Sequence, residues 1–197
     1  MQLETLRPNL WRWTAPHPDW RPLADDGTPI SWPRDVGCVL YVTPGHAVFV
    51  DPLADERDRA FWTWADERCR GRAVAVLETI HFHRRSRDAF VERYGASTDP
   101  PPPVDALRFA LCDETMYWLP EHRALVPGDL LLAGEGGELA LCPERWLGYL
   151  SAKPSAAEAR AALAPLLELD VELVLTSHGG PVLEGAAAAL RAALAPR

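Results

Sequence analysis

Two histidines stand one residue apart in the segment E-T-I-H-F-H-R-R-S, directly after a short apolar run. Imidazoles at this spacing, His81 and His83, can ligate one metal ion. Two arginines, Arg84 and Arg85, follow at once, and a guanidinium group stays protonated in proteins. Because a fixed positive charge repels a metal cation, the segment is predicted to be a metal site, a damaged metal site or a surface loop.

Two further potential ligands follow apolar segments in the same way. Asp129 comes after A-L-V-P-G, and His178 comes after V-E-L-V-L-T-S. In α/β folds, sites form beyond the carboxyl ends of strands, where loops bring distant residues together. A lone H-x-H, P-G-D or S-H-G-G segment is common as a chance pair or a turn, but their shared position favours one site. The set His81, His83, Asp129 and His178 suits zinc, with iron as the alternative.

The elements that must position these residues alternate between strands and helices. Apolar or alternating runs predict strands, and apolar residues at helical spacing predict helices. The expected strands are 10–14, 36–42, 47–50, 73–77, 106–111, 115–119, 123–126 and 171–177, and the expected helices are 55–71, 87–94, 156–169 and 184–195. This order predicts a mixed α/β domain.

The composition narrows the function. The chain has 197 residues, a net charge of −8 and a sequence pI of about 5.2, which argues against nucleic-acid or anionic-membrane surfaces as partners. No segment has the apolar length of a transmembrane helix, and the first residues lack a secretory pattern. The four cysteines form no C-x-x-C pair, so reduced thiols are expected. We therefore expect a cytoplasmic protein. Its expected partner is a small-molecule substrate or ligand, which includes anionic ones.

The order of these motifs resembles that of the metallo-β-lactamase superfamily. Hairpins lead to V-F-V-D-P, H-x-H follows the next strand, and L-P-E-H-R-A-L-V-P-G-D and V-L-T-S-H-G come later. The resemblance implies one domain over residues 1–197, folded as a four-layer αββα sandwich with the metal site along one edge. It also implies that the four residues above are the ligands and that Asp51 braces the site.

The chain departs from the family pattern at the second metal position. The family motif continues as H-x-H-x-D-H, but Arg85 and Ser86 stand at the last two positions. A divalent and a monovalent cation about 4 Å apart repel by roughly 8 kcal/mol at an effective dielectric constant of ~20. We therefore expect at most one metal ion.

The family's mid-chain histidine is also missing. The corresponding stretch, R-F-A-L-C-D-E-T, offers only Cys112, Asp113 and Glu114 as groups that can ligate a metal. Because the four expected ligands divide between two adjacent metal positions in the family, a single ion has to settle between them. His17 or Cys112 can complete such a rearranged set.

Two functions follow from this pattern. In the first, the chain is a hydrolase with one metal ion, Asp129 or the metal's own hydroxide is the base, and Arg84 or Arg85 binds an anionic substrate. In the second, the chain is a non-catalytic, metal-free member of the fold. Arg85 then pairs with Asp129, and the pocket binds a ligand or a partner.

Two local features carry separate predictions. Trp11, Trp13, Trp20 and Trp32 crowd the N-terminal segment, either to pack the sheet and the long loop or to form an aromatic rim or partner surface. The segment 177–180 is expected to turn tightly, because two successive glycines permit positive φ.

Overall fold

The chain forms two compact units in the computed structural model. The model describes residues 2–23, 27–28, 32–134 and 137–196. The first unit consists of Met1–Leu77 and Arg84–Asp99, and the second of Glu78–His83 and Pro100–Arg197. Each unit has its own sheet, helices and apolar core. The expectation of a single domain over residues 1–197 stays a prediction.

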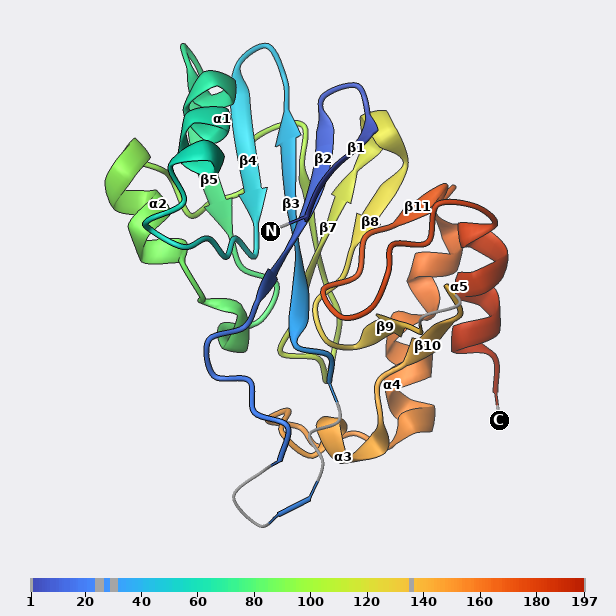
Figure 1. The fold of residues 1–197 in the computed structure, drawn as a ribbon. Coiled ribbons are helices and arrows are strands. Elements are labelled where there is room, and N and C mark those ends of the chain that lie inside the picture. Colours follow the sequence, from blue (N-terminus) through green and yellow to red (C-terminus); the bar gives the residue numbers. More distant parts are fainter. Residues whose placement is uncertain (1, 24–26, 29–31, 135–136, 197) are drawn as a thin grey trace. The chain divides into compact units, whose positions relative to one another are not determined.

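The first unit contains a five-stranded sheet in the order β1-β2-β3-β4-β5, with two helices beside β4 and β5 (Figure 1). Its elements are β1 (Gln2–Arg7), β2 (Leu10–Pro16), β3 (Asp35–Val42), β4 (His46–Val50), α1 (Arg59–Cys69), β5 (Ala73–Leu77) and α2 (Arg87–Tyr94). The strands β1 to β4 run antiparallel, whereas β4 and β5 are parallel and joined by α1. This crossover ends β4 and β5 at the same edge.

Trp13 lies at the centre of the core of this unit. Its side chain is fully buried, its ring centroid is 5.3 Å from that of Phe61, and its Nε1 donates to the Leu53 carbonyl at 2.9 Å. Trp11 packs edge-on against Trp64 at 6.0 Å. The expectation that these tryptophans pack the sheet is therefore confirmed for Trp13.

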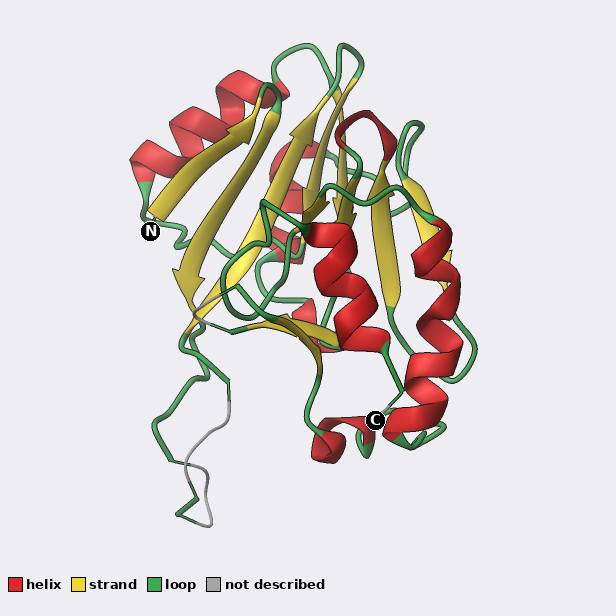
Figure 2. Ribbon diagram, turned by 90° about the vertical axis from the view of Figure 1, so that its right-hand side faces the viewer, coloured by secondary structure: helices red, strands yellow, loops and turns green. Residues whose placement is uncertain are grey.

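The second unit contains a four-stranded sheet in the order β11-β8-β7-β6 and a two-stranded ribbon, β10-β9. Its strands are β6 (Asp105–Arg108), β7 (Thr115–Leu119), β8 (Ala124–Val126), β9 (Leu131–Ala133), β10 (Leu139–Leu141) and β11 (Leu173–Val174). Its helices are α3 (Glu144–Leu147), α4 (Ala156–Leu163) and α5 (Ala186–Leu194). Helices α4 and α5 lie side by side (Figure 2), and β11 runs parallel to β8.

Local sequence signals explain most of the element boundaries. Asp58 caps α1 by accepting the Phe61 amide, so this helix begins later than expected. Helix α2 has its expected bounds and ends at Gly95, which is left-handed with a φ of 60°. The expected helix over 156–169 ends in a 3₁₀ segment, Ala164–Glu168, which carries a proline in its first turn.

The chain turns tightly after β11, as the sequence predicts. Gly179 has a φ of 86°, and a Cβ atom there would lie 1.6 Å from the Ala133 carbonyl oxygen. The Ala133 amide in turn donates to the His178 carbonyl at 3.1 Å. Gly179 therefore combines a left-handed conformation with close contact to β9, which only glycine tolerates.

We predict that Gly179→Ala lowers the free energy of unfolding by at least about 2 kcal/mol, because it adds left-handed strain and a steric clash. Gly180→Ala is the matched control, since a Cβ atom at Gly180 meets nothing within 4 Å. Urea denaturation of both variants measures the difference. Equal stabilities would contradict the close contact at Gly179.

Candidate metal centre

Two of the expected ligands follow neighbouring parallel strands. Asp129 lies in the loop after β8, and His178 lies in the turn after β11. These strands pair in parallel, with Leu173 opposite Ala124. Because parallel strands end at the same edge of a sheet, both side chains reach the same place. The parallel pairing of β8 and β11 within one unit therefore explains why Asp129 and His178 meet beyond the carboxyl ends of their strands.

His83 reaches the same place from the 3₁₀ helix His81–His83 of the second unit. Its side chain is buried, and its Nδ1 lies 2.9 Å from the Thr79 hydroxyl. The Thr115 amide donates to the Thr79 carbonyl at 2.7 Å and so holds this segment against the start of β7. Thr79 fixes the imidazole through one nitrogen and leaves Nε2 to face the site, as second-shell groups do at metal centres.

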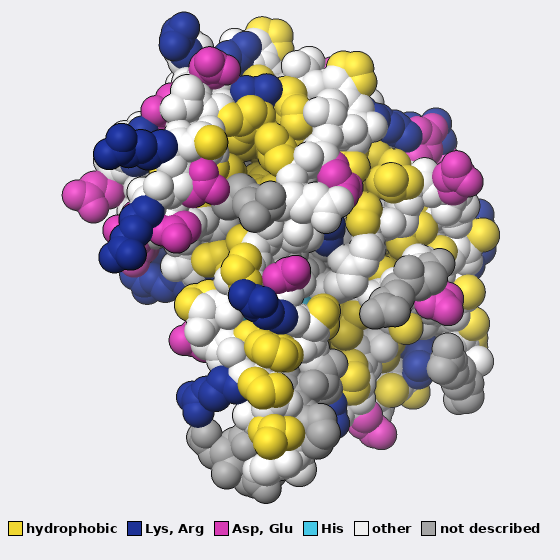
Figure 3. All heavy atoms as spheres, in the orientation of Figure 1, with side chains coloured by type: hydrophobic (Ala, Val, Ile, Leu, Met, Phe, Trp, Pro, Cys, Tyr) yellow, Lys and Arg dark blue, Asp and Glu magenta, His cyan; other side chains and the backbone are white. Residues whose placement is uncertain are grey.

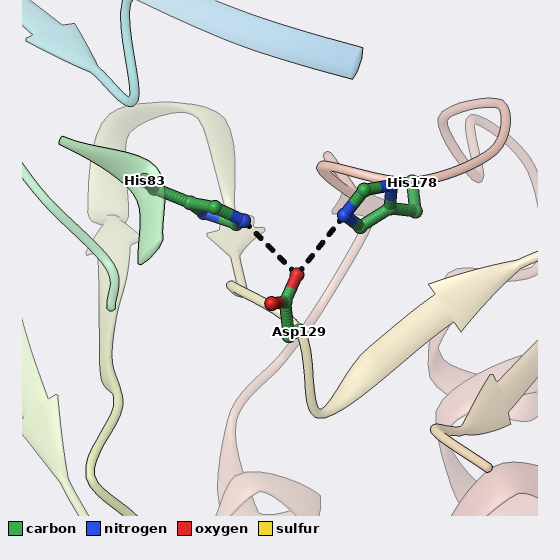
Figure 4. A group of neighbouring side chains, drawn as sticks. All are labelled: His83, Asp129 and His178. Carbon is green, nitrogen blue, oxygen red and sulfur yellow. Dashed lines mark ion pairs between the residues drawn. The ribbon is translucent and has the colours of Figure 1, made fainter. Parts of the chain in front are cut away.

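The three side chains converge on one carboxylate oxygen (Figure 4). Asp129 Oδ1 lies 3.0 Å from His83 Nε2 and 3.2 Å from His178 Nε2. One ligand atom from each residue lies within 4.8 Å of the others. Two atoms bound to one tetrahedral zinc ion at 2.0–2.1 Å are about 3.3 Å apart, so the spacing fits a single ion. Oδ1 is buried, and the Nε2 atoms of both imidazoles face it, as ligand atoms aimed at a common point do.

Electrostatics keep Asp129 ionised. Burial raises the pKa of its carboxyl, but the nearby His83 and His178 outweigh this effect and hold the pKa well below its ordinary value. An ionised carboxylate beside two imidazoles is the donor set that zinc or iron takes. The residues present therefore fit a metal ion.

His81 is not part of this group. Its side chain is exposed and its ring lies 3.9 Å from that of Phe82, and the ligand group found among the described residues comprises only His83, Asp129 and His178. The structure thus brings together three of the four expected ligands.

The other candidates have different surroundings. Cys112 is half-buried, and burial raises the pKa of its thiol to about 11. Asp113 accepts the Ser151 amide at 2.6 Å. His17, in the first unit, accepts the Asp19 amide on Nδ1. Neither Cys112 nor His17 belongs to the ligand group of the described part of the chain.

Arg85 belongs to the first unit and binds backbone oxygens there. Its Nη1 donates to the carbonyls of Gly37 at 3.0 Å and Asp51 at 3.1 Å, and it therefore ties the start of β3 to the end of β4. Asp51, expected to brace the site, is buried in the same unit. Because Arg85 and Asp129 lie in different units, the expected ion pair between them stays a prediction.

Two residues contact the ligands in ways that the sequence did not predict. Glu114 was expected only as a potential ligand, yet its buried carboxylate accepts the amides of Gly128, Asp129 and Leu130. Trp146, in α3, packs its ring edge-on against His178 with 5.6 Å between centroids. Gly128, directly before Asp129, was a sequence signal that another group approaches this loop closely, as Glu114 does. Nothing in the sequence around Trp146 indicated its contact with His178.

Comparisons with solved structures identify the fold. No protein-family model and no curated protein sequence matches the chain. Metallo-β-lactamase structures match over nearly its full length: DIM-1 exposed to ceftazidime has 13% identity and a TM-score of 0.61, covering 98% of this chain and 95% of that one. The chain therefore has the metallo-β-lactamase fold, and the predicted α/β fold class is confirmed.

Two other similar structures are of metallo-β-lactamases with a single zinc ion bound. The NDM_FIM-1-like metallo-β-lactamase from Erythrobacter litoralis, in the mono-zinc form, has 17% identity and a TM-score of 0.57, covering 98% of this chain and 92% of that one. FIM-1 from Pseudomonas aeruginosa, also in the mono-zinc form, has 12% identity and a TM-score of 0.57, covering 99% and 96%.

The depressed pKa of Asp129 predicts how stability depends on pH in the presence of chelator. Its stabilising effect is fully present above the unfolded pKa of about 4 and is lost as the pH falls through the lower folded pKa. The stability difference between wild type and Asp129→Asn should be largest near neutral pH and shrink at about pH 3 and below.

Urea denaturation at several pH values measures this difference. Asp99→Asn, at an exposed position, is the control and should match the wild type at each pH. A difference for Asp129→Asn that stays constant with pH would rule out the stabilised carboxylate.

Proposed function

We propose that this protein is a metallo-β-lactamase-fold hydrolase with one zinc ion held by His83, Asp129 and His178. The observation that carries the proposal is the convergence of their ligand atoms on one point. Catalytic zinc sites commonly have three protein ligands and keep a further position for water or substrate. The mono-zinc forms among the structural neighbours support a single ion.

The residues around the ligands determine what the site can do. When bound, zinc would lower the pKa of a water molecule and polarise a carbonyl or phosphoryl group. Thr79 holds the imidazole of His83 in place, and Trp146 shields one edge of His178 from solvent. Asp129 stays ionised at neutral pH, so its carboxylate can accept a proton or a hydrogen bond as a general base does.

We further propose that the substrate is a small molecule. On the face drawn in Figure 3, the described Lys and Arg side chains are interspersed with Asp and Glu side chains. The net charge of −8 also opposes binding to nucleic acid. Among the described residues, no helix is long and apolar enough to cross a membrane. Arg84 remains the candidate for contact with an anionic group, since its guanidinium is exposed and an ion pair between exposed groups, such as the one with Asp88, contributes little stability.

A metal-free ligand-binding protein is the second candidate. Asp129 already has two imidazoles at ion-pair distance, so its charge can be compensated without a metal ion.

Metal content separates the two candidates. We predict that protein purified without chelator binds one equivalent of zinc, and that His83→Ala and His178→Ala each abolish tight binding. His81→Ala is the matched control and should keep it, because His81 lies outside the ligand group. Elemental analysis measures the zinc content of the purified protein, and zinc titration measures the affinity of the wild type and of each variant. Absence of zinc binding by the wild type would exclude the hydrolase proposal.

Activity is then tested on a β-lactam, a thioester and a phosphodiester. Turnover that is lost with chelator, restored by zinc and absent in His178→Ala would support hydrolysis. Zinc binding without turnover of any ester, amide or phosphodiester would leave a metal-binding protein and contradict the catalytic part of the proposal.

The role of Arg85 is tested by changing its charge. We predict that Arg85→Asp binds zinc more tightly than the wild type, because it removes a cation and supplies an oxygen ligand. Arg85→Ala controls for loss of the hydrogen bonds to Gly37 and Asp51, and thermal unfolding checks that both variants fold. Equal or weaker zinc binding by Arg85→Asp than by Arg85→Ala would mean that Arg85 does not guard the site.

A further inference from the structure

We infer that Glu114 is the positioning residue of this centre and fixes the direction of the ligand Asp129 through the backbone. The inference rests on the proposed metal site and adds to it a residue outside the ligand group. Glu114 is 2% exposed, stands directly before β7, and precedes Asp129 by 15 residues in the sequence.

The carboxylate of Glu114 binds three consecutive amides. Its Oε1 accepts the Gly128 amide at 2.7 Å, and its Oε2 accepts the amides of Asp129 at 2.8 Å and Leu130 at 2.9 Å. Because the amides on both sides of the Asp129 Cα are held, the backbone at this residue has little freedom. The side chain of Asp129 is therefore aimed at the two imidazoles.

Gly128 shows how closely the loop approaches this carboxylate. A Cβ atom at Gly128 would lie 2.8 Å from the Glu114 carboxyl carbon and 2.7 Å from the Thr79 hydroxyl oxygen. Thr79 is the residue that contacts Nδ1 of His83. Thr79 and Glu114 therefore flank the same glycine, and each supports one ligand. The absence of a side chain at Gly128 lets both supports reach the loop.

A carboxylate suits this position better than an amide side chain. The carboxyl group of Glu114 has two oxygens, and three backbone N–H donors share them. A glutamine has one acceptor oxygen, and its NH₂ group would face a backbone N–H that also donates. Glu114→Gln should therefore lose at least one of the three bonds while keeping the size of the side chain.

The test compares zinc affinity and amide exchange in Glu114→Gln and the wild type. We expect zinc affinity to fall about 10–100-fold, the usual cost of losing a second-shell contact. The absorption spectrum of the cobalt-substituted protein should change as the Asp129 ligand shifts. Amide hydrogen exchange at Gly128, Asp129 and Leu130 should become faster with and without metal.

Glu158→Gln is the matched control. Glu158 also accepts a backbone amide, that of Ser155, but at the exposed start of α4. It should lose stability without a change in zinc affinity or in the cobalt spectrum. Glu114→Asp, which keeps the charge and shortens the reach, carries the test if Glu114→Gln does not fold.

The outcomes separate this inference from the function on which it rests. Zinc binding by the wild type with unchanged affinity and cobalt spectrum in a folded Glu114 variant would overturn the inference alone, and Glu114 would then be purely structural. No zinc binding by the wild type would overturn the proposed function and this inference together.

Discussion

The two ion pairs of the partly buried Asp129 carboxylate are the interaction on which the candidate centre of the second unit depends. A carboxylate removed from water is costly unless charges or donors compensate it. The imidazoles of His83 and His178 approach Oδ1. The backbone amides of Asp129 and of the residues on either side of it donate to Glu114. The buried carboxyl group of Glu114 and the partly buried one of Asp129 therefore lie close together. Burial, together with the charge of Asp129, raises the pKa of Glu114 to about 7. Such a concentration of acidic and imidazole groups is typical of a functional site and unusual for a core.

Part of this arrangement was predictable from the sequence. Apolar runs ending in His83, Asp129 and His178 indicated strands with ligands at their carboxyl ends, and the parallel pairing of β8 and β11 explains why two of them meet. The exclusion of His81 from the group was not predictable. The H-x-H pattern does not indicate that the segment forms a 3₁₀ helix, in which the ring of His83 is buried and that of His81 is exposed. The spacing of two histidines shows only that they are close in the sequence, whereas the local backbone conformation decides whether both can bind one ion.

Glu114 and Arg85 show a different limit of sequence reasoning. Both were considered as groups acting directly on a metal or a charge, and both bind backbone atoms in the structure. Backbone partners carry no signature in the sequence, because every residue supplies an amide and a carbonyl. Only the glycine before Asp129 gave an indirect sign, since it marks a position where a side chain cannot fit. The edge strand β1, the three-residue strands β9 and β10 and the helix α3 were likewise missed, because their stability depends on neighbouring elements.

The ligand group combines segments that are distant along the chain but all belong to the second unit. The stretch Glu78–His83 joins that unit as an excursion between two parts of the first, so His83 reaches its partners only after long-range contacts have formed. An unfolded chain holds these three side chains too far apart to chelate one ion, so the affinity for metal belongs to the native state. Linkage then makes a metal at this centre a thermodynamic stabiliser of the folded chain, with an effect that grows with the logarithm of free metal concentration. The abundance of the folded protein in a cell would in that case follow the supply of the metal.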